Sequence, residues 1–269
     1  MPTTGPGTAG GIARRAVMDG AGLVLVAGGD GTINEALEGI VGSRVPLGIL
    51  PAGTANVLAN EMDMPGAIEA AAARLAACVP CRIPVGRVCY PQGGARYFLL
   101  MAGSGLDARV VYQVSGPLKA KFGKIAYWIA GFSLAGRVLD EFEVRVEGRL
   151  YTCSFALVSK VRNYGGDLEI ARDTSLFDDR FEVVLFAGRN SVRYVKYLLG
   201  VALKRVGGMR GVTVLRARRV ELAPAPGGRV HLQVDGEFAG RLPVALEVVP
   251  DALTLLIPPG YASRFGRTV

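Results

Sequence analysis

Histidine is almost absent from this chain of 269 residues, since His231 is the only one. A Ser-His-Asp triad would have to use it, and no G-x-S-x-G nucleophile motif accompanies it, which argues against a hydrolase of that kind. Cysteine is scarce too, with four in all. Cys78 and Cys81 form a C-x-x-C pair, but a zinc site needs two further ligands and no second pair exists. We therefore expect small buried thiols in a reducing cytosol.

Long hydrophobic runs are missing as well. No apolar stretch reaches the roughly 18–20 residues that span a bilayer, and residues 1–19 contain no signal-peptide core. We expect a cytoplasmic protein, either soluble or peripheral at the inner face of the membrane. Acidic residues are in the minority, with Asp+Glu 23 against Lys+Arg 31, which gives a net charge of +8. That charge suits anionic lipid or nucleic acid and does not choose between them.

The composition is that of a folded protein, because 50% of the residues are hydrophobic and only 20% are charged. Over 1–83, short apolar strands alternate with helical stretches, which is typical of a parallel sheet with crossover helices. Over 84–250 the pattern is mostly strands and turns, and Tyr151–Val158 and Val212–Leu222 each read as one strand. Helices are predicted over about 121–135 and 192–206. We therefore predict an α/β domain followed by a β-rich domain, and leave open whether the C-terminal segment 251–269 returns to the first domain.

The α/β domain reads as incomplete at its start. An open α/β sheet normally has strands on both sides of its ligand crevice. Only two clear strands, Leu23–Ala27 and Val45–Leu50, precede residue 83, and residues 1–20 predict loop and helix. We expect that about one strand–helix–strand unit is lacking at the beginning.

The strongest local signal is G-G-D-G-T-I-N-E at 28–35, between a buried strand and a helix. Glycines let backbone N–H groups approach a phosphate, and a helix N-terminus adds partial positive charge. Asp30 places a carboxylate in this loop, so we expect Mg²⁺ or ordered water between it and the phosphates. The simpler alternative is a glycine-rich turn in which Asp30 caps the helix. The fixed spacing of the whole motif favours a nucleotide site.

A second strand–loop–helix unit repeats part of this motif. G-T-x-N occurs at Gly31–Asn34 and again at Gly53–Asn56. Two such loops at the carboxyl ends of neighbouring parallel strands would face one crevice. Either loop alone reads as an ordinary capped helix, but the pair favours contacts with phosphate or ribose.

With these motifs in place, the sequence resembles the diacylglycerol kinase catalytic-domain family, which includes sphingosine kinases and bacterial lipid kinases. The motifs that carry the resemblance are, in chain order, G-G-D-G-T-I-N-E at 28–35, P-x-G-T-A-N at 51–56, G-L-D-A at 105–108, K-F-G-K-I-A-Y at 121–127, N-Y-G-G at 163–166, D-D at 178–179 and V-D-G-E at 234–237. The resemblance implies an ATP-binding α/β domain and a β-sandwich domain with the active site between them. It also implies transfer of the ATP γ-phosphate to the hydroxyl of a diacylglycerol-like lipid or a long-chain base.

The resemblance also assigns roles residue by residue. The implied ATP contacts are Thr3, Gly29, Asp30, Gly31, Thr32, Ile33, Asn34, Glu35 and Thr54. Glu237 matches the family's proton acceptor, and Asp30 is the second candidate catalytic residue. The D-D turn matches a Mg²⁺ site of the bacterial branch, in which the Asp179 side chain and the carbonyls of Leu176 and Phe181 would bind the ion.

Three departures from the family pattern leave alternatives open. The first strand and the N-P-x-x-G phosphate loop are absent, so Met1 lies inside a longer gene or the chain is a degenerate member. Arg180 follows the two aspartates where the family often has glycine, which weakens the Mg²⁺ assignment. Val57 follows Asn56 where the family often has aspartate. An NAD kinase-like enzyme, which shares G-G-D-G-T, and an inactive lipid- or nucleotide-binding member are therefore retained beside the lipid kinase.

One segment bears on the lipid side. Arg189–Arg219 carries nine basic residues and no acidic one, and apolar residues recur in it at helical spacing. Such a helix rests on an anionic membrane or packs on the sandwich with its basic residues solvated, and the pattern favours neither. Nucleic acid is disfavoured because no aromatic stacking motif accompanies the charge. A homodimer is left open.

Overall fold

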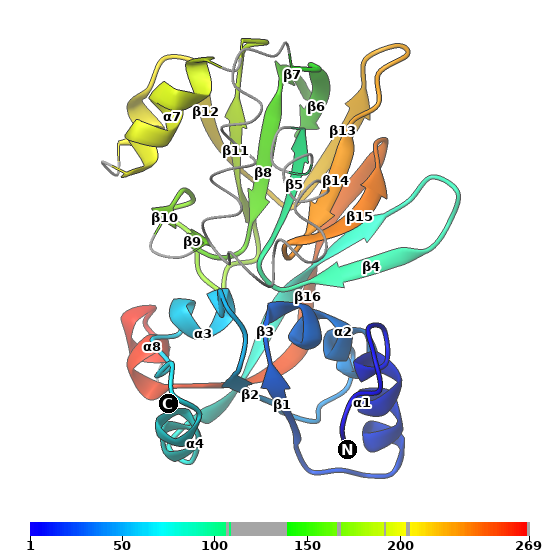
Figure 1. Ribbon diagram of the computed structural model, residues 1–269, viewed down its shortest axis with the longest axis vertical. Helices are drawn as coiled ribbons and strands as arrows, with labels where there is room; N and C mark the ends of the chain where they lie inside the picture. The colour runs from blue at the N-terminus through cyan, green and yellow to red at the C-terminus, as the bar shows by residue number, and fades with distance from the viewer. Residues whose placement is uncertain (106–107, 109–138, 166–167, 191, 203–204, 268–269) are drawn as a thin grey trace.

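The computed structural model describes residues 1–105, 108, 139–165, 168–190, 192–202 and 205–267. Two halves lie one above the other along the long axis of the molecule (Figure 1). The lower half consists of α1 (Ala9–Met18), β1 (Val24–Gly28), α2 (Asp30–Ile40), β2 (Leu47–Pro51), α3 (Val57–Glu61), α4 (Ile68–Leu75) and α8 (Pro259–Arg264). The predicted helix over about 121–135 lies outside the described residues.

The upper half is built mainly of strands. They are β4 (Ala95–Phe98), β5 (Met101–Gly105), β6 (Phe142–Val146), β7 (Arg149–Cys153), β8 (Phe155–Ser159), β9 (Asn163–Gly165), β10 (Leu168–Glu169), β11 (Phe181–Phe186), β12 (Val212–Ala217), β13 (Arg219–Pro224), β14 (His231–Val234) and β15 (Glu237–Arg241). Helix α7 (Val192–Ala202) and a short 3₁₀ turn, η1 (Val206–Gly208), lie between β11 and β12.

The helices and strands of the lower half form where the spacing of the apolar residues predicts them. The buried hydrophobic residues of α2 recur three and four positions apart and form one face: Ile33, Ala36, Leu37 and Ile40. Strands β1 and β2 pair in parallel, with Val24 opposite Leu47. Parallel pairing puts the carboxyl ends of both strands at one edge of the sheet, and α2 and α3 begin at that edge.

The upper half is a sandwich of two sheets. The second sheet has the strand order β12-β11-β8-β5-β14-β15, and it faces the β13-β6-β7 end of the first sheet. A hydrophobic core lies between them, in which the rings of Phe98 and Phe181 stack with centroids 5.6 Å apart. The predicted fold class, an α/β half followed by a β-sandwich, is confirmed.

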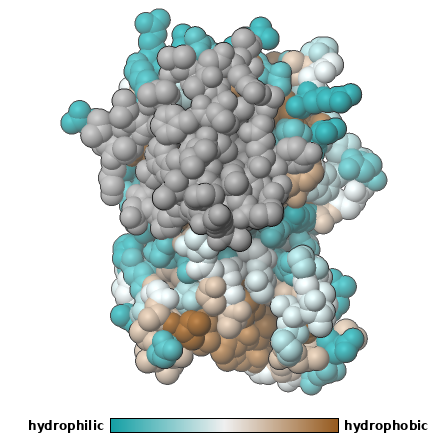
Figure 2. Space-filling view, in the orientation of Figure 1, coloured by the Kyte–Doolittle hydropathy of each residue, from teal (hydrophilic) through white to brown (hydrophobic). Residues whose placement is uncertain are grey.

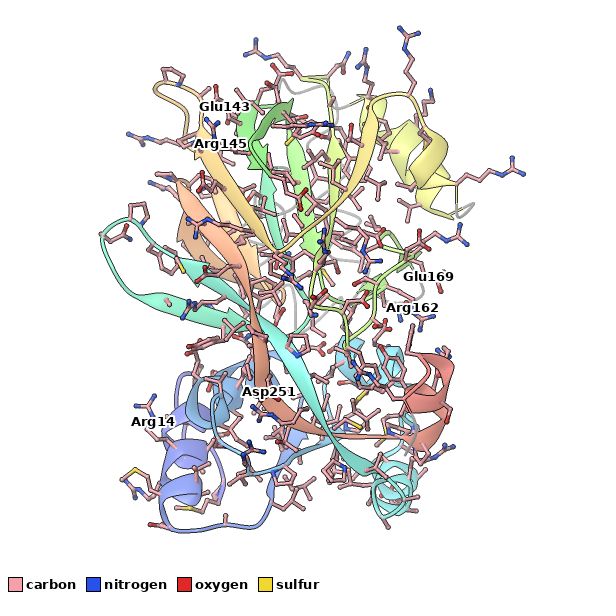
Figure 3. All side chains as sticks on the ribbon, turned by 180° about the vertical axis from the view of Figure 1, so that it is seen from behind. Arg14, Glu143, Arg145, Arg162, Glu169 and Asp251 are labelled. Carbon is pink, nitrogen blue, oxygen red and sulfur yellow. The ribbon has the colours of Figure 1, made fainter. Side chains whose placement is uncertain are left out.

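Two long strands run through both halves: β3 (Val79–Cys89) and β16 (Val244–Ile257). They pair antiparallel from Cys89 opposite Ala245 to Val79 opposite Ile257, and Figure 3 shows them from behind as they pass between the halves. Strand β3 therefore continues through position 83/84 without a linker. The division of the chain at that position stays a prediction.

Two strand predictions are wrong in the same way, because one predicted strand is in fact two. Tyr151–Val158 is divided at Ser154 into the end of β7 and β8, and Val212–Leu222 is divided at Arg218 into β12 and β13. In each pair the two strands belong to different sheets. A chain that crosses from one sheet to the other keeps its apolar, β-branched character, so sequence pattern alone does not mark the crossing.

Strand β1 is the edge of the first sheet. Leu23 and Leu25 are exposed there, and Ile68 at the start of α4 is exposed too. Figure 2 shows hydrophobic surface on this lower half. The expected additional strand–helix–strand unit stays a prediction. Among the helices that the structure describes, none is long and apolar enough to cross a bilayer.

Candidate active site

The two G-T-x-N loops touch each other through their glycines. A Cβ atom on Gly53 would lie 2.5 Å from Gly29 Cα, and one on Gly29 would lie 3.1 Å from Gly53 Cα. The Ala52 N–H also donates to the Gly28 carbonyl, at 3.0 Å. Only glycine allows this backbone approach, so the sequence brings the two loops together where β1 and β2 end.

The first turn of α2 offers backbone donors at this point. The Ile33 N–H is used within the helix, where it donates to the Gly29 carbonyl at 3.1 Å, and the Ile33 side chain is buried. No acceptor within the described residues is recorded for the N–H groups of Asp30, Gly31 and Thr32. These are the groups that a helix N-terminus leaves for an anion.

The Asp30 carboxylate has a structural task. It accepts hydrogen bonds from the N–H groups of Val57 at 3.0 Å and Leu58 at 3.2 Å, and so caps α3. Asn56, in the left-handed region at φ 46°, closes the second loop by accepting from the Gly53 N–H at 2.8 Å. Asp30 therefore fixes the second loop relative to the first, and its unused lone pairs remain available to a cation.

The other predicted nucleotide contacts differ in position. Glu35 accepts from the N–H groups of Gly7 at 2.7 Å and Ala9 at 3.1 Å, so its carboxylate holds the start of α1 on α2. Thr54 is exposed on the second loop, and Thr3 is exposed in the segment before α1. The ATP roles of these three residues stay predictions.

Glu237 lies directly over the first loop, although it is more than two hundred residues away in sequence. It begins β15, and a Cβ atom on Gly31 would lie 2.6 Å from its Oε1 atom. Its other carboxylate oxygen, Oε2, accepts from Arg96 Nη2 at 2.7 Å. The fold thus brings the predicted proton acceptor to the predicted phosphate loop, at the contact between the two halves.

A buried network fixes this arrangement from behind. Asp235, 7% exposed, accepts from Asn34 Nδ2 at 2.9 Å and from the N–H groups of Leu99, Leu100 and Met101 at 2.9–3.0 Å. Burial raises the pKa of Asp235 to about 6, and the three backbone N–H groups oppose that rise. Asp235 therefore joins α2 to the sandwich.

Sequence reasoning did not single out Arg96 or a role for Asp235. Asp235 was within reach of such reasoning, since it stands in V-D-G-E two residues before Glu237. Arg96 had no such signal, because a single arginine in a predicted strand is ordinary. Its role follows only from the side chains of Asn34 and Glu237 that the fold places beside it.

The predicted metal turn is occupied by the protein's own cations. The Asp179 carboxylate pairs with Arg218, which lowers the pKa of Asp179, and the Asp178 carboxylate pairs with Arg216 at 2.6 Å. The buried Lys160 ammonium donates to the Asp178 carbonyl, and burial lowers its pKa to about 8.

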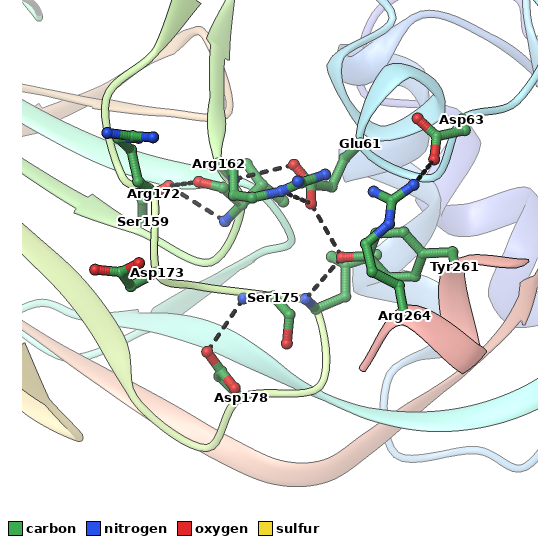
Figure 4. Close-up of polar contacts among 12 residues, drawn as sticks. Glu61, Asp63, Ser159, Arg162, Arg172, Asp173, Ser175, Asp178, Tyr261 and Arg264 are labelled. Atoms are coloured by element: carbon green, nitrogen blue, oxygen red, sulfur yellow. Dashed lines mark hydrogen bonds and ion pairs between the residues drawn. The ribbon is translucent and has the colours of Figure 1, made fainter. Parts of the chain in front are cut away.

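Other polar groups of this turn are also engaged. The Asp178 carboxylate accepts from the Ser175 N–H at 3.1 Å, and the Leu176 N–H donates to the Tyr261 hydroxyl at 3.2 Å (Figure 4). Phe181 is buried at the start of β11. Within the described residues no cluster of three His, Cys, Asp or Glu side chains could hold a metal ion. Lysine and arginine beside Asp178–Asp179 disfavour a divalent cation there. The assignment of Mg²⁺ to the Asp179 side chain and to the carbonyls of Leu176 and Phe181 stays a prediction.

A second polar link joins the halves beside this turn. Glu61, fully buried at the end of α3, accepts from Arg162 N at 3.0 Å, from Arg162 Nε at 3.1 Å and from the Tyr261 hydroxyl at 3.0 Å (Figure 4). Tyr261 belongs to α8, so the end of the chain packs on the lower half. This link and the Asp235 network join the two halves at two separate points.

The model of the diacylglycerol kinase catalytic domain matches residues 1–88, and the model of the YegS C-terminal NAD kinase beta sandwich-like domain matches residues 101–257. A diacylglycerol kinase of Bacillus subtilis is 29% identical over 247 residues, which is 90% of this chain and 79% of that protein. A diacylglycerol kinase of Mycobacterium tuberculosis is 28% identical over 248 residues, with the same shares covered.

Solved structures agree with the fold. A crystal structure of a diacylglycerol kinase from Bacillus anthracis superposes with a TM-score of 0.77 at 20% identity, and covers 97% of this chain and 85% of that chain. A second crystal structure from the same organism gives a TM-score of 0.81 at 20% identity, over 96% of this chain and 84% of that chain. At this level of identity the likeness establishes the two-part architecture.

Proposed function

Since this chain belongs to the diacylglycerol kinase catalytic-domain family and is a lipid kinase, we propose that it transfers the γ-phosphate of ATP to the hydroxyl of a diacylglycerol-like lipid or a long-chain base. The observation that carries the proposal is the position of Glu237. Its carboxylate lies over Gly31, in the first turn of the helix that offers free backbone N–H groups. An acceptor for the lipid proton and a site for phosphate therefore share one crevice.

The first loop and α2 supply the phosphate site. The N–H groups of Asp30, Gly31 and Thr32 and the partial positive charge of the helix N-terminus favour an anion. The glycine contact brings the backbones of the two loops together at this site. Asn34 does not face this anion with its amide, since both of its Nδ2 donors are used by Tyr97 and Asp235.

ATP is the phosphate donor and brings Mg²⁺ with it, which neutralises charge on the phosphoryl oxygens when bound. Asp30 and Glu237 are the described carboxylates at this site, Asp235 is buried behind it, and Arg96 is the cation that contacts Glu237. Carboxylates beside the site repel the phosphates of free ATP, so the site suits a cation-bound nucleotide. Asp30 is the candidate partner of that cation, because its oxygens keep free lone pairs.

The chemical step then needs one proton acceptor. The lipid hydroxyl oxygen attacks the γ-phosphorus, the bond from that phosphorus to the β,γ-bridging oxygen breaks, and ADP leaves. The hydroxyl proton passes to a Glu237 carboxylate oxygen. Positioned general-base catalysis contributes about 10²–10⁴-fold, so Glu237 accounts for part of the rate while binding and charge neutralisation supply the rest.

For the lipid side, we propose that α7 rests on an anionic membrane surface. Arg193, Lys196 and Arg210 line a hollow of about 560 Å³ together with Tyr197 and Gly211. Within the described residues no carboxylate is recorded in an ion pair with these three cations. Several other basic residues of the upper half are paired, as Arg216 is with Asp178. A concave group of unpaired cations attracts anionic headgroups.

Replacement of Glu237 by Gln tests the proposal. The variant keeps shape and polarity but loses the base, so the single-turnover rate of phosphate transfer from ATP to a lipid mixture should fall about 100-fold or more. ATP affinity, measured by calorimetry, should change little, because the loss is specific to the transition state.

Glu221→Gln is the matched control, since Glu221 lies in an exposed ion pair with Arg219 on the sandwich. It should leave both measurements unchanged. An unchanged single-turnover rate in Glu237→Gln would remove Glu237 from the mechanism. Failure of the unaltered chain to phosphorylate any lipid with ATP would overturn the proposed reaction.

A further inference from the structure

Arg96 touches both sides of the crevice with one nitrogen atom. It lies on β4, and its Nη2 atom donates to Asn34 Oδ1 of α2 at 2.9 Å and to Glu237 Oε2 of β15 at 2.7 Å. Its side chain is 24% exposed and that of Glu237 is 37% exposed. The contact is thus partly shielded from water, where an ion pair is stronger than on an open surface.

Asn34 presents a fixed acceptor to Arg96. Both protons of its Nδ2 atom are used, one by the Tyr97 carbonyl at 3.0 Å and one by Asp235 Oδ2 at 2.9 Å. An asparagine amide has one acceptor oxygen and one donor nitrogen, so this pairing sets which way the amide faces. The Oδ1 atom must therefore point toward Arg96, and the buried network determines where Arg96 lies.

Strand β4 itself is tied to α2. The Tyr97 N–H donates to Glu38 Oε1 at 2.7 Å, and Phe98 is fully buried in the core of the sandwich. Burial raises the pKa of Glu38, and Arg96 opposes that rise. Arg96 therefore projects from a strand whose position is fixed on both sides.

Several carboxylates gather around the first turn of α2, where Glu237 lies over Gly31. Asp30 and Asp235 are close enough that Asp30 raises the pKa of Asp235. A bound nucleotide adds further negative charge at the N-terminus of α2. Among the described residues, Arg96 is the cation in contact with the Glu237 carboxylate, and its charge offsets the repulsion from neighbouring carboxylates.

We propose that Arg96 is a positioning residue for phosphoryl transfer. Its guanidinium holds the Glu237 carboxylate over Gly31 and links it through Asn34 to the helix that receives the phosphates. What Glu237 does in this arrangement rests on the proposed function, whereas the coupling of Arg96 to Glu237 does not. Arg96 acts through Glu237, so its effect on the rate requires the carboxylate.

A double-mutant cycle tests this. The variants are Arg96→Ala, Glu237→Gln and the double variant, each measured for single-turnover phosphate transfer at saturating ATP, ATP affinity and urea midpoint. Arg96→Ala should lower the rate about 10-fold or more in the original chain and less than about 2-fold in the Glu237→Gln background. ATP affinity should stay within about 3-fold in every variant.

Two further variants separate positioning from plain stability. Arg87→Ala is the matched control, because Arg87 lies on the paired strand β3 of the same hairpin and forms an ion pair with Glu247. It should change the urea midpoint without changing the rate. Arg96→Lys should recover part of the rate, since both contacts use a single nitrogen that an ammonium can replace.

The outcomes decide between the claims. Equal rate losses from Arg96→Ala in both backgrounds, or an unchanged rate in the original chain, would overturn the proposal. If the original chain phosphorylates no lipid, the proposed function fails. The urea midpoints of the four proteins then still test whether Arg96 and Glu237 are coupled. The contact is supported if the double variant loses less stability than the sum of the losses in the two single variants. Additive losses of stability overturn it.

Discussion

Asp235→Asn replaces one carboxylate oxygen by an amide NH₂ group, and the structure predicts that this small change lowers the stability of the fold. The side chain keeps its size, and asparagine tolerates the left-handed backbone at this position, where φ is 47°. All four recorded partners of Asp235 are donors, namely three backbone N–H groups and Asn34 Nδ2. In either orientation of the new amide, its NH₂ group faces two of those donors.

The magnitude follows from two opposed terms. Two partner donors and the new NH₂ group are left buried without acceptors, at about 1–3 kcal/mol each, which gives a loss of roughly 3–9 kcal/mol. The neutral amide also removes the cost of burying a charge. With a folded-state pKa of about 6 against an ordinary 3.8, that cost is about 3 kcal/mol at neutral pH. The net loss is therefore about 3 kcal/mol, or a melting temperature lower by about 6–12 °C.

The pH dependence gives an independent check. A carboxyl whose folded-state pKa is raised stabilises the fold at low pH, and that contribution is lost as the pH rises through the folded-state value. The original chain should therefore lose unfolding free energy relative to Asp235→Asn between about pH 4 and pH 6. The gap between the two proteins should be widest at the acid end of that window.

Thermal melts and urea titrations at several pH values measure both effects. Asp251→Asn is the matched control, because Asp251 also has a left-handed backbone, at φ 48°, but its side chain is exposed beside Arg82. It should leave the melting temperature nearly unchanged. Equal shifts in the two variants would refute the reasoning, since burial of the carboxylate is what distinguishes them.

Three further predictions follow from the same contacts. Asp30→Ala should abolish turnover even at saturating Mg²⁺ and cost about 1 kcal/mol of stability, because α3 loses its cap; near-normal turnover would contradict the role given to Asp30. The double replacement of Arg193 and Lys196 by Glu should reduce co-sedimentation with anionic vesicles at low salt and have little effect at high salt; unchanged binding at low salt would favour a merely solvated face. The original chain should gain stability between about pH 8 and pH 10, because the Lys160 pKa is lowered in the folded state and the unfolded chain binds the proton more tightly. Lys160→Met should remove that gain; parallel pH profiles of the two proteins in urea titrations would count against a buried ammonium.

The local part of the site could be predicted from the sequence because its signals are local. A buried strand, a glycine turn and a helical period follow one another within residues 24–40, and each depends on neighbours a few positions away. The glycines at 29 and 53 are needed for the backbone contact that the structure shows. The sequence pattern therefore predicted two loops at one sheet edge without any tertiary information.

The surroundings of the predicted metal turn show where pattern reasoning stops. The family resemblance assigns a cation to Asp179 and to the carbonyls of Leu176 and Phe181, and Arg180 departs from the family pattern. Arg180 instead pairs with Glu147, at 3.4 Å. The cations that reach the turn are Arg216 of β12, Arg218 between β12 and β13, and Lys160 directly after β8. Cross-strand neighbours are set by sheet register, and a sequence does not display its register.

The sequence by itself determined the fold class and the nucleotide-type loops, because periodicity, glycine requirements and short motifs act over a few residues. Glu237 became the candidate acceptor through the family resemblance. Only the tertiary structure decided that Glu237 lies over Gly31, that Arg96 lies between Asn34 and Glu237, and that Asp235 joins α2 to the sandwich. These contacts connect positions up to 206 residues apart, from Gly31 to Glu237 (237 − 31). They depend on how two hairpins of the sandwich, β3–β4 and β14–β15, dock on α2, and that docking is fixed by packing of the whole core.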